Sequence, residues 1–88
     1  MKYNCVYITG SGNEYNDGVW ELKKTPKTET LTKVSEYMSG VYAMHKVGKR
    51  FKIGVNTGNP ARHHKDGTFT VYFGQAGTPY YFTPTINK

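Results

Sequence analysis

The chain lacks the marks of several large classes of protein. It has one cysteine, Cys5, so no intramolecular disulfide can form. No stretch approaches the roughly 20 apolar residues of a membrane-spanning helix, and residues 1–10 contain no apolar core of a secretion signal. These absences lead us to expect a soluble, cytoplasmic protein.

Leucine is also scarce. Only Leu22 and Leu31 occur in 88 residues, whereas there are 8 tyrosines and the aromatic share is 15%. Tyrosine and β-branched residues favour a pleated, half-buried surface, and disordered chains are poor in aromatic residues. The length suits one small domain, which we place at residues 1–84, with a frayed tail at 85–88.

Acidic residues are few in the second half of the chain. Residues 1–36 contain five lysines and five acids, whereas residues 37–88 contain seven basic residues and only Asp66 as an acid. The second half therefore carries the whole net charge of +6. Such asymmetry favours an anionic partner, although a basic surface can also serve only to keep a small protein in solution.

Alternation of side chains predicts the first two strands, at residues 2–9 and 19–24. We expect Cys5 to face the core as a small hydrophobic residue, and Trp20 and Leu22 to form the core face of the second strand. The loop between the strands, residues 10–18, ends in Asp17-Gly18, which is typical of a hairpin turn.

The middle of the chain changes period. Leu31, Val34, Tyr37, Met38 and Val41 fall at helical spacing, which predicts one short amphipathic helix at about 29–39. The alternative is a strand, because Thr28, Thr30 and Thr32 alternate and threonine favours sheets. Further strands are predicted at 41–47, 51–56, 68–73 and 80–83, separated by a basic turn at 48–50, a polar loop at 57–67 and a turn at 75–79. In the strand at 51–56, Phe51, Ile53 and Val55 are predicted to face inward.

This order, β-β-α-β-β-β-β, predicts an α+β domain: an antiparallel sheet of five to six strands with one short helix on one face. The runner-up is a small barrel of five or six strands with an incidental helix. Which face of the sheet the helix covers is open at this point.

The stretch from residue 45 to residue 66 is the most informative for function, because it is rich in lysine, arginine and histidine. Lysine and arginine contact phosphates, and tyrosine rings stack on unpaired bases. We therefore predict a non-enzymatic protein that binds nucleic acid, single-stranded or RNA, without a cofactor or metal. The predicted binding residues are Lys46, Lys49, Arg50, Lys52, Arg62, His63, His64, Lys65, Tyr42 and Tyr72.

Two other functions stay open. The first is an inhibitor or adaptor, of the kind that phages encode, which binds a host protein through its tyrosines and arginines. The second is a small metal-free ribonuclease in which His63 or His64 acts with Arg62 and Lys65. Adjacent histidines on an extended segment point opposite ways, so we do not expect them to chelate a metal. The strand at 80–83 is predicted to be an exposed edge, which would suit a homodimer.

Overall fold

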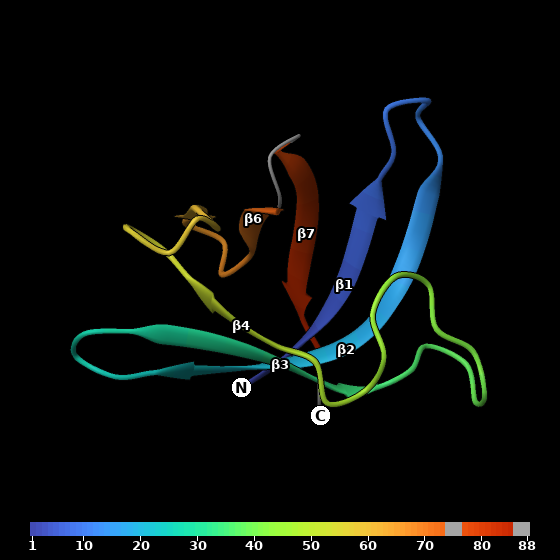
Figure 1. The fold of residues 1–88 in the computed structure, drawn as a ribbon, viewed down its shortest axis with the longest axis horizontal. Helices are drawn as coiled ribbons and strands as arrows, with labels where there is room; N and C mark the ends of the chain where they lie inside the picture. The colour runs from blue at the N-terminus through green and yellow to red at the C-terminus, as the bar shows by residue number, and fades with distance from the viewer. Residues whose placement is uncertain (74–76, 86–88) are drawn as a thin grey trace.

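Seven antiparallel strands make up the regular structure. The computed structural model describes residues 1–73 and 77–85, and the strands form one sheet in the order β4-β3-β2-β1-β7-β6-β5. The sheet curls into a nearly closed, barrel-like domain (Figure 1). The strands are β1 (Lys2–Ile8), β2 (Glu14–Lys24), β3 (Glu29–Ser35), β4 (Arg50–Ile53), β5 (Ala61–His63), β6 (Phe69–Phe73) and β7 (Thr78–Pro84).

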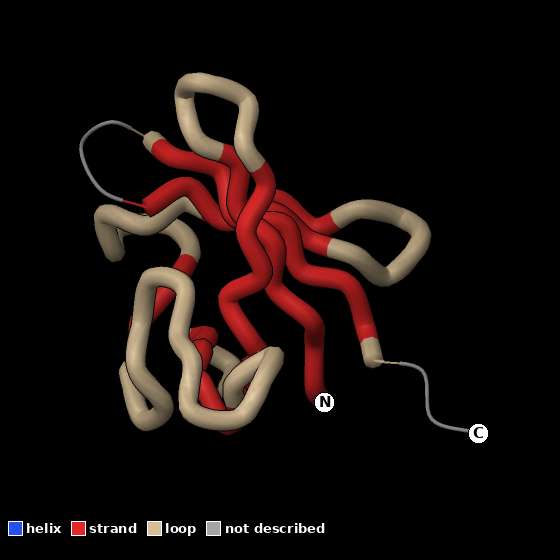
Figure 2. Tube along the Cα trace, turned by 90° about the vertical axis from the view of Figure 1, so that its right-hand side faces the viewer, coloured by secondary structure: helices blue, strands red, loops and turns tan. Residues whose placement is uncertain are grey.

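The predicted α+β fold is wrong, because the described residues contain no helix (Figure 2). Of the predicted helix at 29–39, residues 29–35 form β3, which pairs with β2 on one side and β4 on the other, and residues 36–39 lie in a loop. Hydrogen bonds to two neighbours outweigh a weak helical period, and the period of two places Leu31 and Lys33 inside the barrel, both fully buried. The runner-up barrel is nearer to the observed sheet, but it too included a helix and had fewer strands.

Asp17 and Gly18 lie inside a strand and not at a hairpin turn. β2 is continuous from residue 14, and its pairing shifts register with β1 between Asn4 and Val6 and with β3 between Val19 and Trp20. Gly18 has a φ of 76°, and a Cβ at this position would lie 2.3 Å from the carbonyl oxygen of Ser35. The pair therefore forms a β-bulge that only glycine fits; the turn itself lies at residues 9–13, closed by backbone hydrogen bonds.

The predicted strand at 41–47 is also wrong, because those residues belong to the loop at 36–49 between β3 and β4. The predicted strand at 51–56 ends at Ile53, and Val55, predicted to face inward, is 88% exposed. Conversely, the predicted loop at 57–67 contains the short strand β5. The strand predicted at 51–56 ends early because Gly54 and Asn56 have φ of 109° and 67°, and a strand cannot continue through such positive values.

The predicted edge strand at 80–83 lies in the interior of the sheet. β7 pairs with β1 on one side and with β6 on the other, so it has no free edge for a second copy; the terminal strands are β4 and β5. Of the predicted tail, Thr85 is tied to Lys2, whose carbonyl oxygen accepts from the Thr85 amide at 3.0 Å. Residues 86–88, and residues 75 and 76 of the predicted turn, lie outside the described residues.

The core fills the inside of the barrel with aromatic side chains. Cys5, Trp20 and Leu22 are buried, as predicted. The Phe69 and Phe82 rings stack with centroids 4.7 Å apart. The buried apolar residues are Tyr3, Cys5, Tyr7, Trp20, Leu22, Leu31, Ile53, Phe69, Val71, Phe73, Tyr80 and Phe82.

Side chains close the seam between the two ends of the sheet. Asn59 Nδ2 donates to the Lys52 carbonyl at 3.0 Å. His63 on β5 reaches Glu29 on β3, with Nε2 and Oε1 2.9 Å apart. These bonds hold the two outer strands near each other, although β4 and β5 do not pair. Within the described residues, no helix has the length and apolar character needed to cross a membrane.

Candidate functional site

A buried ion pair lies at the bulge of β2. Lys33 Nζ is 2.9 Å from Asp17 Oδ1, and both side chains are fully buried. The same ammonium is 2.8 Å from Glu36 Oε1 and donates to the His45 carbonyl. Three acceptors surround the three ammonium hydrogens, so this buried charge is fully hydrogen-bonded.

The Asp17 carboxylate anchors the loop at 36–49. Its Oδ1 accepts from the backbone amides of Met44 and His45 at 3.3 and 3.2 Å, and its Oδ2 lies 2.7 Å from His45 Nδ1. Trp20 Nε1 donates to the Asp17 carbonyl at 2.7 Å. The bulge therefore aims one carboxylate at a loop that begins 19 residues later in the sequence.

Hydrogen bonds hold both partners of the ion pair in their charged forms. Burial alone would raise the pKa of Asp17, but hydrogen bonds from His45 and Lys33 outweigh it and lower that pKa. Burial alone would lower the pKa of Lys33, but the contacts with Glu36 and Asp17 outweigh it and raise that pKa. An ionised carboxylate accepts hydrogen bonds only, so His45 Nδ1 carries the proton it donates to Asp17.

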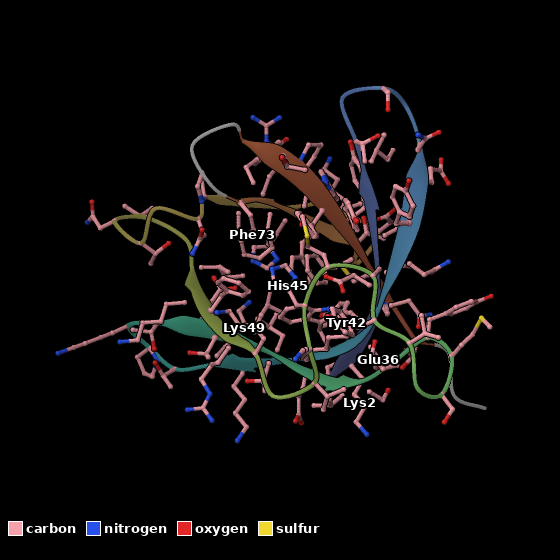
Figure 3. All side chains as sticks on the ribbon, turned by 45° about the vertical axis from the view of Figure 1, so that its right-hand side comes forward. Lys2, Glu36, Tyr42, His45, Lys49 and Phe73 are labelled. Carbon is pink, nitrogen blue, oxygen red and sulfur yellow. The ribbon has the colours of Figure 1, made fainter. Side chains whose placement is uncertain are left out.

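His45 forms one wall of an aromatic pocket. Its ring centroid lies 5.0 Å from that of Phe51, 5.8 Å from that of Tyr80 and 6.0 Å from that of Phe73. In the view of Figure 3, His45 lies between Phe73 and Lys49. Within the described residues, His45 Nε2 has no hydrogen-bond partner. The pocket, of about 390 Å³, is lined by Met44, His45, Phe51, Asn59, Phe73, Thr78 and Tyr80.

A basic cleft lies on the outer face of the sheet. The register places Lys23, Thr30 and Lys52 in one row across β2, β3 and β4. Glu21, Thr32 and Arg50 form the neighbouring row. The cleft, of about 450 Å³, is lined by Glu21, Lys23, Thr25, Thr30, Thr32, Arg50 and Lys52.

The basic side chains of the surface are left without acidic partners. Of the eleven described lysines and arginines, Lys33 alone makes an ion pair or a side-chain hydrogen bond with another described residue. Lys33, Asp17 and Glu36 together carry −1, so the rest of the chain carries a formal charge of +7. The surface is therefore more basic than the net charge indicates.

The predicted binding residues are spread over several places. Arg50 and Lys52 line the basic cleft, next to Lys23. Lys49 lies on the other side of β4, with Nζ 5.3 Å from the Phe51 ring centroid. Lys46 lies over the ring of Tyr42 at 5.6 Å, within the loop at 36–49.

The remaining predicted residues lie around β5 and β6. Arg62, His64 and Tyr72 line an outer cleft of about 350 Å³, together with Tyr81. His64 Nε2 is 3.0 Å from Thr70 Oγ1, whereas His63 turns to Glu29. The two histidines thus face opposite sides of the sheet. Lys65 is exposed in the turn between β5 and β6.

Two features of these sites could not be predicted from the sequence. Lys23 joins Arg50 and Lys52 only through strand register, which no local pattern reveals. The contact of His45 with Asp17 joins residues 28 positions apart. The one local signal for this buried site is that two charged residues, Asp17 and Lys33, occupy inward-facing positions that are apolar elsewhere on their strands.

No cluster of three or more histidine, cysteine or acidic side chains suited to a metal occurs among the described residues. Comparison with known proteins adds nothing to the assignment: no protein family matches the chain, and neither a curated protein nor a solved structure is significantly similar to it.

Proposed function

We propose that the protein binds single-stranded nucleic acid without cleaving it, and that the basic cleft holds the phosphate backbone. The observation that carries the proposal is the row-by-row arrangement of Lys23, Arg50 and Lys52, three unpaired cations around one cleft. Lysine and arginine bind phosphates and release condensed counterions as they do so. Thr30 lies between Lys23 and Lys52, and Thr32 lies beside Arg50, so their hydroxyls add hydrogen-bond donors for phosphate oxygens.

The outer face also offers aromatic rings for unpaired bases. Tyr81 on β7 is 41% exposed, and it lines an outer cleft with Tyr72 and Arg62. Every base has a π-face that stacks on such rings regardless of sequence. A surface that combines phosphate-binding cations with exposed tyrosines favours a single strand over a duplex, whose bases are already stacked.

Fluorescence anisotropy with a labelled single-stranded oligonucleotide tests the proposal. We expect binding at low salt, with log affinity falling linearly against log salt concentration. Replacing Lys23, Arg50 and Lys52 together by alanine should make the slope shallower by about 0.7 for each phosphate that these side chains neutralise in the wild type. Lys65→Ala, an exposed charge outside the cleft, serves as the control. Absence of binding at low salt, or an equal effect of Lys65→Ala, would refute the proposed function.

A second candidate, an inhibitor or adaptor that binds another protein, is favoured by the loop at 36–49. Several of its large apolar side chains are at least half exposed, and exposed apolar side chains that gather in one patch are typical of protein interfaces. Purification of tagged protein after nuclease treatment at high salt tests this candidate. A stable protein partner that no longer binds after Tyr37→Ser and Met38→Ser would support it. The exposed residues are Tyr37, Met38, Val41, Tyr42, Met44 and Val47.

A further inference from the structure

We infer that the aromatic pocket beside His45 holds one unpaired base of the bound strand. This inference rests on the proposed function and adds a specific site to it. The pocket is separate from the basic cleft, since the two share no lining residue. The aromatic rings and His45 that line the pocket suit a ligand that is flat, largely apolar on its faces and polar at its edge. A nucleobase has these properties.

The size and walls of the pocket suit such a ligand. Its volume of about 390 Å³ falls in the range of about 300–1,000 Å³ that is usual for small-molecule sites. Phe51 and Phe73 lie with ring centroids 4.6 Å apart, and Tyr80 packs edge-on against Phe73 at 4.7 Å. Unpaired bases are commonly held by stacking on aromatic side chains of this kind.

His45 supplies a polar contact for the edge of the base. Asp17 accepts a hydrogen bond from Nδ1, so the Nε2 atom of His45 presents a lone pair when the ring is in its neutral form. That lone pair accepts a hydrogen bond from an exocyclic amino group, which adenine, cytosine and guanine carry and thymine and uracil lack. The pocket should therefore prefer amino-bearing bases.

Strand β4 links the pocket to the basic cleft. It is a terminal strand of the sheet, and consecutive side chains on a strand point to opposite faces. Lys49 hydrogen-bonds to β3 through its backbone and places its ammonium over Phe51, a wall of the pocket. Arg50, the next residue, faces the cleft. A backbone that crosses this edge meets both cations and can turn one base inward.

The test compares a short single-stranded oligodeoxynucleotide of cytosines with a thymine oligomer and a fully abasic oligomer of the same length. Wild-type protein should bind the cytosine oligomer roughly five- to hundredfold tighter than the abasic one, with thymine between them. Phe73→Leu keeps an apolar side chain without its ring, and it should remove most of this difference while leaving the abasic affinity unchanged. Tyr15→Leu, which removes an exposed ring that lines neither the pocket nor either outer cleft, should leave the difference intact.

Nuclear magnetic resonance of the His45 ring gives a second readout. The three histidines of the chain can be assigned by substitution, and the His45 ring signals should shift with the cytosine oligomer and not with the abasic one. If all three oligomers bind equally, or if Phe73→Leu leaves the difference intact, the pocket does not hold a base while the proposed function stands. If no oligomer binds at low salt, the proposed function fails and the inference falls with it.

Discussion

The Asp17 carboxylate and the Lys33 ammonium lie 2.9 Å apart with both side chains fully buried, although 16 positions separate them in the sequence. Asp17 lies at a bulge of β2 and Lys33 lies on β3, so the pair ties two neighbouring strands together from inside the barrel. Asp17 also anchors His45, and Lys33 also binds Glu36. One ion pair therefore connects the barrel to two points of the loop that borders the pocket, Glu36 and His45.

Lys33→Met should destabilise the protein strongly. Methionine fills a similar volume, but it leaves the buried Asp17 carboxylate without its cation. Removing one partner of a buried pair costs about 3–5 kcal/mol. Urea unfolding followed by circular dichroism measures the change. The control is Lys24→Met, an exposed lysine of β2, which should change the free energy of unfolding by less than about 0.5 kcal/mol; an equally small loss for Lys33→Met would contradict the role assigned to the pair.

The stability of the fold should depend on pH through Asp17. Its pKa is lower in the folded protein than its ordinary value, so its contribution is present above about pH 4, the pKa in the unfolded chain, and is lost as pH falls through the folded pKa. The pKa of Lys33 is raised, so its contribution is present below about pH 10 and is lost as pH rises through the folded value.

Urea unfolding between pH 7 and pH 2 measures the acid side of this dependence. Asp17→Asn should lower the free energy of unfolding at neutral pH and flatten its decline in acid. Asp66→Asn is the matched comparison, because hydrogen bonds from Thr68 lower the pKa of Asp66 at an exposed position, where solvent screens the effect. The assignment fails if both variants follow the same curve.

Gly18→Ala should be among the most damaging small substitutions in the chain. The positive φ alone costs an L-residue about 1–2 kcal/mol, and the new Cβ would also lie 2.3 Å from the Ser35 carbonyl oxygen, which is part of the backbone. Gly12→Ala separates the two effects: Gly12 has a φ of 90° but open space around it. Thermal unfolding should therefore show a distinctly larger loss for Gly18→Ala than for Gly12→Ala.

The alternation of apolar and polar side chains predicted which face of a strand is buried. Trp20 and Leu22 on β2 are buried as expected, because alternation gives that strand one apolar face. The prediction for 29–39 was wrong because its apolar residues fit both the helical period and the strand period. Only the pairing with β2 and β4 decides between the two. Asp17-Gly18 misled because the same dipeptide suits a turn and a bulge.

The candidate sites depend on contacts that local patterns do not encode. Arg50 and Lys52 were predicted from their charge, but their association with Lys23 follows from register across three strands. His45 belongs to the segment at 41–47, which was predicted to be a strand. It lies instead in a loop and is held by Asp17, because the bulge redirects that carboxylate. The predicted binding residues therefore lie on separate surfaces of the curled sheet.

Glu21→Gln should strengthen nucleic-acid binding. Glu21 is the one acid among the residues that line the basic cleft, where it lies in the same row as Thr32 and Arg50. Its charge repels phosphate and offsets part of the attraction of Arg50, and removing it should tighten binding roughly two- to fivefold at low salt. Fluorescence anisotropy with the same labelled oligonucleotide measures this gain, which should shrink as salt rises.

Glu14→Gln is the matched control for this gain. It changes the net charge by the same amount, but Glu14 lies at the start of β2, where it pairs with Ile8 and lines no part of the cleft. If both variants bind more tightly by the same factor, the attraction comes from overall charge and the cleft has no special role. A gain confined to Glu21→Gln would mean that the phosphate lies close to this carboxylate, as the proposed function requires.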